Sequence, residues 1–169
     1  MEGISSHTIK RHLGADAIRM MPSSPNTIQE RRGIAAIYPH NDILSRVLAA
    51  LEMQVYRLPA EDLMHAFTVG VCLPAALLAI GDDGEIRAAA IGLAEEYPDF
   101  PKICAWARDV LPKFERDEDR ENYIRRTATK GGITEAIIES LSSGKGLYQS
   151  LRKGIDRSRE ISRQFDDRK

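Results

Sequence analysis

The sequence predicts a mainly α-helical protein that begins with a small α/β part. Two observations predict this fold class. Short apolar runs alternate with helical patterns before Pro59, and helical periodicity dominates from there to the end of the chain. With 43% apolar residues among 169, the chain can bury the core of one domain, or of a small domain with an appendage. We therefore divide it into residues 1–58 and residues 59–169.

The α/β part is expected to alternate helices and strands. Ser5 and Ser6 can cap the first helix and Gly14 can end it, while Asn41 can cap the second. In chain order we expect a helix up to residue 13, a strand at 17–21, an extended loop at 22–26 and a strand at 33–38. A helix follows, with Ile43, Leu44, Val47, Leu48 and Leu51 on one face. The third strand is expected within 52–58, where Met53 and Val55 alternate with Gln54 and Tyr56. Because three short strands rarely form a stable sheet alone, they either pack on the helices that follow or belong beside further strands.

The most apolar run, residues 66–80, lies in a helix that we expect to begin with Glu61 and Asp62 in its first turn. The run is too short to span a bilayer and contains Pro74, so we interpret it as a buried core helix rather than a membrane segment. It is apolar on nearly every side, and a chain of this size has little room to bury it fully. We therefore expect a homodimer in which a second copy covers this helix.

The rest of the helical part is expected to begin after a turn at residues 81–84. Three helices are expected at 85–96, 100–114 and 118–127. A fourth follows the turn at Gly131 and Gly132 and has Ile133, Ile137 and Leu141 on one side. The last runs from 147 to about 165, with Leu147, Leu151, Ile155 and Ser158 in register. Another turn, at 142–146, separates the last two.

Composition argues against several classes of function. The net charge is −1 at pH 7 and basic residues form no evident stripe, so we expect no nucleic-acid binding. Cys72 and Cys104 stand alone and the histidines form no pair at i, i+4, so we expect no metal site. The two cysteines are interpreted as buried thiols in a reducing compartment, the cytoplasm. No G-x-G-x-x-G turn follows a strand, so the dinucleotide fingerprint is absent from the sequence.

Residues 126–136 place a two-glycine turn at the start of a helix. The first amides of a helix have no internal partners and carry partial positive charge, so such a turn favours an anion. Gly131 and Gly132 let the backbone approach a bound group closely, and Thr134 falls in the first helical turn. The turn is therefore either an anion site or a plain helix start that Thr129 or Thr134 caps.

Three stretches together resemble one enzyme family. Residues 19–25 (R-M-M-P-S-S-P) resemble an R-x-M-P-N-T-P loop, and residues 129–136 (T-K-G-G-I-T-E-A) resemble S-P-G-G-T-T-x-A. The tail at 141–162, with Gly144, Ile155, Arg157, Arg159 and Glu160, resembles a final helix pair. Over most of its length the chain is similar to the C-terminal part of the pyrroline-5-carboxylate reductases, which reduce an imine in proline synthesis.

The resemblance implies a fold and an assembly. Residues 59–169 would form a helical dimerisation domain of the 6-phosphogluconate dehydrogenase C-terminal type, and residues 1–58 a remnant of a Rossmann sheet with about three strands. In the family, an N-terminal Rossmann domain holds NADP or NAD, the helical domain interlocks with a second copy, and the substrate lies where the two domains meet. This sequence lacks the nucleotide-binding motif. We therefore expect a fragment of a longer reductase, or a product that has lost its nucleotide half, that is inactive alone and binds no cofactor tightly.

The resemblance also assigns roles to individual residues. It implies that Thr134 is the catalytic threonine that hydrogen-bonds the imine. It places Thr129, Lys130, Gly131 and Gly132, together with Thr134, around the substrate. It places Met21, Pro22, Ser23, Ser24 and Pro25 on the nicotinamide side. These roles suit the physics, because a carboxylate is favourable at a helix N-terminus and hydride transfer depends mainly on positioning.

Several residues depart from the family pattern. Lys130 stands where the family has proline, Ser23 where it has asparagine, and residues 71–73 (V-C-L) replace small polar residues. Lys130 and Arg126 either bring a more anionic ligand to the turn or are solvated surface charges. Two alternatives follow: a non-catalytic dimeric helical binding or scaffold protein derived from the family, and a reductase of another imine or of a keto acid.

Overall fold

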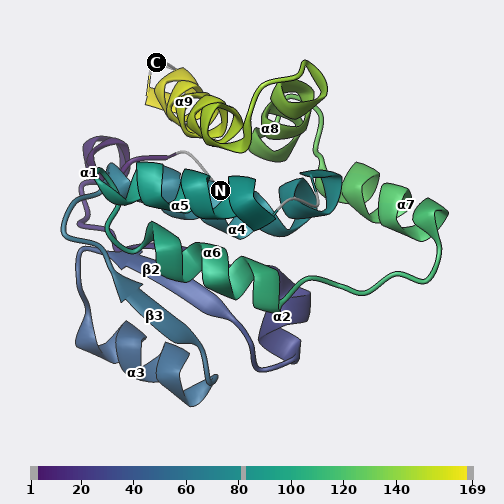
Figure 1. Cartoon of the computed structure of the whole chain (residues 1–169). Helices are drawn as coiled ribbons and strands as arrows, with labels where there is room; N and C mark the ends of the chain where they lie inside the picture. The colour runs from purple at the N-terminus through teal and green to yellow at the C-terminus, as the bar shows by residue number, and fades with distance from the viewer. Residues whose placement is uncertain (1–3, 81–82, 167–169) are drawn as a thin grey trace. The chain divides into compact units, whose positions relative to one another are not determined.

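The computed structural model of the chain describes residues 4–80 and 83–166. Helices dominate it and three strands lie near the start, as the sequence predicts (Figure 1). In chain order the elements are α1 (Ser6–Leu13), β1 (Arg19–Pro22), α2 (Pro25–Gln29), β2 (Ile34–Tyr38), α3 (Asp42–Ala50), β3 (Gln54–Arg57), α4 (Leu63–Ile80), α5 (Asp83–Ala94), α6 (Phe100–Asp109), α7 (Asp117–Thr127), α8 (Ile133–Ser142) and α9 (Leu147–Asp166).

Internal contacts divide the chain into two units. Unit 1 comprises Met1–Phe67 and Arg159–Lys169, and unit 2 comprises Thr68–Ser158. The boundary between the two units lies within α4, and the end of α9 belongs to unit 1.

A three-stranded sheet with the order β1-β2-β3 lies in unit 1. β1 runs antiparallel to β2, with Met20 opposite Ile37, and β2 runs parallel to β3, with Ala35 opposite Val55. α3 supplies the crossover that parallel strands need. Residues 34–37 of the central strand are buried, which explains why this strand reads as a continuous apolar run.

Both faces of this sheet are covered. On one face Ala35 and Ile37 pack with Leu48 of α3 and with Met53. On the other face Tyr56 is buried, and its ring centroid lies 5.4 Å from that of Phe67. The alternation expected for the third strand is present, but the face that carries Tyr56 is not a solvent face, because the start of α4 packs there.

Local signals set the ends of two helices as predicted. The Ser5 hydroxyl accepts from the Thr8 N–H at 3.1 Å, and Gly14, at φ 66°, ends α1. The Asn41 side chain accepts from the Leu44 N–H at 2.8 Å and begins α3.

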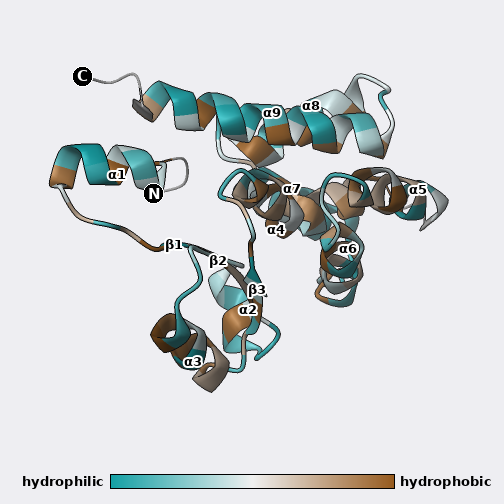
Figure 2. Ribbon diagram, turned by 90° about the vertical axis from the view of Figure 1, so that its left-hand side faces the viewer, coloured by the Kyte–Doolittle hydropathy of each residue, from teal (hydrophilic) through white to brown (hydrophobic). Residues whose placement is uncertain are grey.

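The apolar face expected for α3 is buried only in part. Leu48 is 3% exposed and Leu44 is half-buried, whereas Ile43, Val47 and Leu51 are 67%, 51% and 53% exposed. Figure 2 shows the strongly hydrophobic colouring of this helix. The sequence pattern identified the helix correctly, but it did not distinguish residues packed on the sheet from apolar residues left at the surface.

Three element boundaries differ from the prediction. Glu61 and Asp62 lie in the turn before α4, not in its first helical turn. α6 ends at Asp109 rather than at 114, because Pro112 disfavours helical backbone in the residue before it. The turn expected at 81–84 lies partly outside the described residues, and α5 already begins at Asp83.

The core of unit 2 is built from helices alone. The register predicted for the last helix is confirmed, because Leu147, Leu151 and Ile155 are fully buried and Ser158 is 6% exposed. The remaining large side chains that are almost fully buried there are Val69, Leu73, Leu93, Phe100 and Ile137. Figure 2 shows hydrophilic and hydrophobic segments alternating along α9, as an amphipathic helix requires.

α4 is the most apolar helix of the chain. By length and composition it could cross a membrane, but 56% of its residues are buried within the protein, and a core helix passes the same test. Val71, Cys72 and Leu78 are only half-buried. Cover by a second copy stays a prediction.

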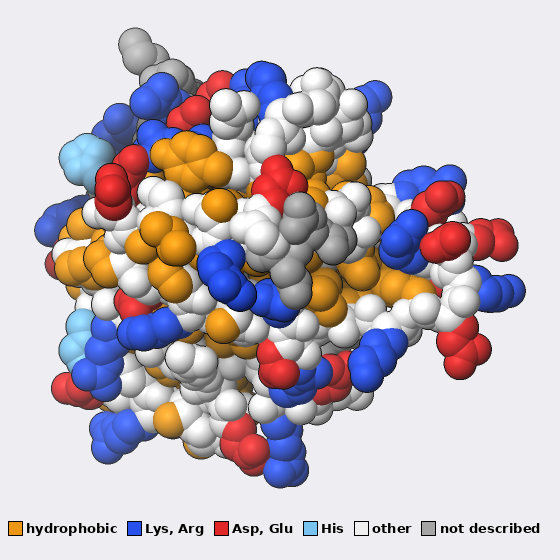
Figure 3. Space-filling model, in the orientation of Figure 1, with side chains coloured by type: hydrophobic (Ala, Val, Ile, Leu, Met, Phe, Trp, Pro, Cys, Tyr) orange, Lys and Arg blue, Asp and Glu red, His pale blue; other side chains and the backbone are white. Residues whose placement is uncertain are grey.

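α7 differs from the other helices of unit 2, because none of its residues is buried. Three acidic residues occupy its first turn and two arginines its last, which suits the helix dipole. Figure 3 shows charged side chains of both signs gathered over this helix.

Candidate functional site

The two-glycine turn immediately precedes α8. Gly131 has φ 70°, a conformation that glycine adopts without strain. The Gly132 N–H donates to the Thr129 carbonyl at 2.8 Å, and a Cβ on Gly132 would lie 2.7 Å from that same oxygen. Both positions therefore need glycine for steric reasons, and Thr129 and Lys130 are exposed on the turn.

A carboxylate already occupies the amide side of this turn, and it belongs to the chain. The Gly131 N–H donates to the Glu135 carboxylate at 2.5 Å. Glu135 is the third residue of α8, the position from which a glutamate commonly reaches back to an amide before the helix. The anion preference predicted for the turn is thus met internally, and no side chain caps α8 through Gly132.

Arg157, one of the tail residues in the resemblance, contacts the turn. From α9, its guanidinium donates to the Gly131 carbonyl through Nε at 2.9 Å and through Nη2 at 2.7 Å. The turn is therefore held on both sides of Gly131, by Glu135 at the N–H and by Arg157 at the carbonyl. Thr134, in the first turn of α8, is 8% exposed.

The segment predicted to face a nicotinamide, residues 21–25, lies in unit 1. Met21 and Pro22 belong to β1 and pair with β2. The buried Ser23 hydroxyl accepts from the Ile34 N–H at 3.0 Å and from the Thr27 hydroxyl at 2.8 Å, and the Ser23 N–H donates to the Ile34 carbonyl at 2.8 Å.

The prediction of an extended loop at 22–26 is wrong for the second half of that stretch. Ser24 caps α2, and Pro25 is the first residue of that helix. Proline suits this position because the first helical residue needs no N–H partner and its φ is already helical.

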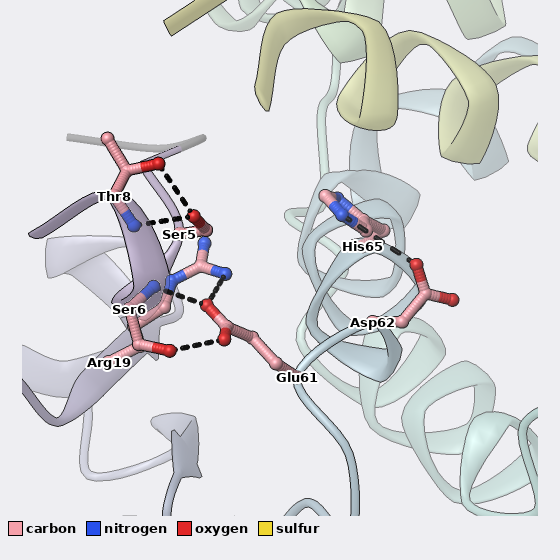
Figure 4. A network of polar contacts seen from close by, with 7 residues as sticks. All are labelled: Ser5, Ser6, Thr8, Arg19, Glu61, Asp62 and His65. Carbon is pink, nitrogen blue, oxygen red and sulfur yellow. Dashed lines mark hydrogen bonds and ion pairs between the residues drawn. The ribbon is translucent and has the colours of Figure 1, made fainter. Parts of the chain in front are cut away.

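Unit 1 contains a polar network that no sequence motif indicated (Figure 4). The Glu61 carboxylate accepts from the Ser6 N–H at 2.7 Å, from the Ser6 hydroxyl at 2.5 Å and from Arg19 Nη1 at 2.8 Å. Burial alone would raise the pKa of Glu61, but the hydrogen bonds from Ser6 and Arg19 outweigh it and hold the pKa below its ordinary value. No local pattern links these residues, since they are 42 to 55 positions apart.

The next residue, Asp62, continues the network. The Arg159 guanidinium donates to it through Nη2 at 2.8 Å, and this hydrogen bond lowers the pKa of Asp62 against the effect of burial. His65 Nε2 lies 4.0 Å from the Asp62 carboxylate. Burial lowers the pKa of His65, and the nearby Asp62 opposes that shift.

A half-open apolar pocket of about 450 Å³ adjoins this network within unit 1. Apolar side chains form most of its wall, with Arg19, Thr8 and His12 as the polar members. The apolar members are Ile4, Ile9, Leu13, Ile18, Met20, Met21, Met64 and Phe165.

The chain matches no family model, no curated protein and no solved structure. Among the described residues, no group of three or more His, Cys, Asp or Glu side chains could hold a metal ion.

Proposed function

We propose that this chain is the substrate-side and dimerisation region of an NAD(P)-dependent reductase similar to the pyrroline-5-carboxylate reductases, inactive without a nucleotide-binding half. The carboxylate held on the Gly131 amide carries the proposal. It supports an anion preference at the turn that the resemblance associates with the substrate carboxylate. In this proposal the protein is cytoplasmic and a homodimer through its C-terminal helices.

A ligand carboxylate would take the place of Glu135 on the Gly131 N–H. The exchange replaces one anion by another at a helix N-terminus, where an anion gains about 0.3–1 kcal/mol, so the net gain is small. We expect millimolar affinity, about −4 kcal/mol. The exposed Lys130 would attract the anion, and the Thr134 hydroxyl would donate to an imine nitrogen beside it.

The residues on the cofactor side do not fit a dinucleotide by themselves. The Ser23 hydroxyl and N–H are both committed to Ile34 and Thr27, and the Ser24 hydroxyl caps α2. NADP or NAD would be held by residues other than these.

Calorimetric titration with L-proline, the product that the resemblance implies, tests the proposal. Pyrrolidine, which has the same ring without the carboxylate, is the control ligand and should not bind. Glu135→Ala should tighten proline binding about two- to fivefold, because the competing carboxylate, which is stabilised by about 0.3–1 kcal/mol, is gone. Glu139→Ala, which removes an exposed carboxylate one turn later in α8, should leave the affinity unchanged. Equal binding of both ligands, or equal effects of both variants, would refute the substrate-side role.

A second candidate is a non-catalytic binding or scaffold protein derived from the same family. The bonds of Glu135 and Arg157 to Gly131 favour it, because they close the turn without any ligand. In that case Glu135→Ala gains no affinity for proline while self-association persists. A reductase of another substrate would instead show the Glu135→Ala gain with a keto acid such as pyruvate, or with a carboxylate that carries another imine, in place of proline.

A further inference from the structure

Residues 129–132 form a hydrogen-bonded β-turn. The Gly132 N–H donates to the Thr129 carbonyl at 2.8 Å, and Gly131, the third residue of the turn, has φ 70°. Positive φ at the third residue and not at the second marks a type II turn, in which proline is common at the second residue. The second residue here is Lys130, so the turn lacks the ring that would fix φ at that position.

The turn lies at the surface, and two side chains hold its backbone. Thr129, Lys130 and Gly131 are exposed, and the Lys130 N–H makes no hydrogen bond to any described residue. Glu135 accepts from the Gly131 N–H, and Arg157 donates to the Gly131 carbonyl. The order of this exposed turn therefore depends on these two contacts and on the bond within the turn.

The two contacts respond differently to a ligand carboxylate. In the proposed function the ligand displaces Glu135 from the Gly131 N–H, so this contact opens as the ligand binds. A carboxylate accepts hydrogen bonds and cannot donate one to the Gly131 carbonyl, so the ligand does not compete with Arg157. Arg157 therefore stays on the turn when Glu135 leaves it.

Arg157 is well placed to hold the turn because it projects from an anchored helix. It belongs to α9, whose Leu151 and Ile155 are fully buried in the core of unit 2. Its Nε and Nη2 donate to the same oxygen at 2.9 and 2.7 Å, a two-pronged contact that the single ammonium of lysine does not reproduce. Nη2 would lie 3.6 Å from a Cβ on Gly131, so the guanidinium also packs against this glycine.

We propose that Arg157 is a positioning residue that keeps the two-glycine turn ordered, with its Gly131 N–H available, after Glu135 has been displaced. The inference rests on the proposed function, which supplies the ligand that displaces Glu135. Loss of Arg157 then matters most when Glu135 is absent, because either side chain alone still holds the turn.

Exchange of amide hydrogens with solvent, measured by NMR on the ¹⁵N-labelled protein, tests the proposal without any ligand. Glu135→Ala reproduces the released state. In that background Arg157→Ala should speed exchange of the Gly132 N–H, whose bond closes the turn, about tenfold. With Glu135 present the same change should speed it at most about threefold. Arg152→Ala removes another arginine of α9, which pairs with Glu96, and should leave the exchange unchanged.

Titration of the same variants with L-proline measures the consequence for the site. In the Glu135→Ala protein, Arg157→Ala should weaken proline binding about tenfold. Arg157→Lys should recover little of this loss, because lysine keeps the charge but not the two-pronged contact. Added to the Arg157→Ala change, Lys130→Pro fixes φ in the turn and should bind proline about two- to fivefold more tightly than Lys130→Ala, which removes the same charge.

The outcomes separate this inference from the proposed function. Unchanged Gly132 exchange in the protein that lacks both Glu135 and Arg157 would overturn the positioning role. Full recovery of proline binding by Arg157→Lys would also overturn it, because the charge of the guanidinium, and not its contact with Gly131, would then act on the ligand. If the exchange results hold but no variant binds L-proline, the hold of Arg157 on the turn is supported and the proposed function alone is refuted.

Discussion

Replacing Gly70 with alanine should destabilise the protein by about 2 kcal/mol. Gly70 lies in α4, and a Cβ there would be 2.4 Å from Cγ2 of Ile103 on α6, about 1 Å closer than the 3.4 Å at which ordinary contact begins. The methyl is fixed on a β-branched carbon and Ile103 is 4% exposed, so it has little freedom to move. Overpacking near the upper end of its usual cost, about 3 kcal/mol, exceeds the gain of about 1 kcal/mol from alanine in a helix.

Urea unfolding followed by circular dichroism measures this change. A matched control is Gly92→Ala in α5, where the new Cβ meets the ring of Tyr148 at 3.0 Å. Tyr148 is 40% exposed and can rotate outward, so this variant should be as stable as the natural protein or slightly more stable.

Ile103→Leu moves the branch away from Cβ and should recover part of the loss in the Gly70→Ala background. If Gly70→Ala and Gly92→Ala unfolded with the same free energy, the close approach of α4 and α6 would be refuted.

Three further predictions concern the polar network and the assembly. Glu61→Gln should lower the free energy of unfolding by about 1–3 kcal/mol, because Arg19 loses its counter-ion. The control Glu52→Gln, in an exposed ion pair with Arg31, should change the free energy of unfolding by less than about 0.5 kcal/mol in the same urea titration. The protein should lose stability as the pH falls from 7 to 5, because burial lowers the pKa of His65 in the fold and the unfolded chain takes up a proton near 6.5 first. His65→Gln should remove this loss of stability between pH 7 and pH 5. It should not remove the loss at lower pH, where Glu61 and Asp62, whose pKa values are lowered in the fold, become protonated. If the variant showed the same change of unfolding free energy with pH between 7 and 5, the assignment to His65 would be contradicted. Sedimentation at micromolar concentration should give a dimer, and a monomer would exclude a second copy as the cover of α4.

Helix ends were predictable because their signals are local. Ser5, Gly14 and Asn41 act on backbone groups within a few residues of themselves, so the sequence window contains the whole interaction. The start of α2 was equally readable from Ser24 and Pro25, a cap followed by proline at the first helical position. The nearby Pro22 favoured a loop reading instead.

The rest of the fold depends on contacts that no short window contains. The partners of Glu61 lie far away in the sequence, and the burial of Tyr56 depends on Phe67 covering the second face of the sheet. The exposure of Ile43 and Val47 has the same origin, because periodicity reports which side of a helix is apolar but not what packs on it.

The sequence predicted correctly that a glycine turn precedes a helix at residues 131–132, but not that the Glu135 carboxylate would bind the Gly131 amide. Glu135 accepts from the Gly131 N–H only four residues before it, and a glutamate in the first turn of a helix commonly reaches back in this way, so a local signal existed. The bond from Arg157 to the Gly131 carbonyl spans 26 residues and required the structure.

The amide resonance of Gly131 tests the central claim most directly. Titration of the ¹⁵N-labelled Glu135→Ala protein with L-proline should shift the Gly131 and Gly132 amide signals in a saturable way, while the Gly92 signal stays in place. Pyrrolidine should shift none of them. A Gly131 signal that does not respond to L-proline, or that responds equally to pyrrolidine, would contradict the proposal that this turn holds a substrate carboxylate.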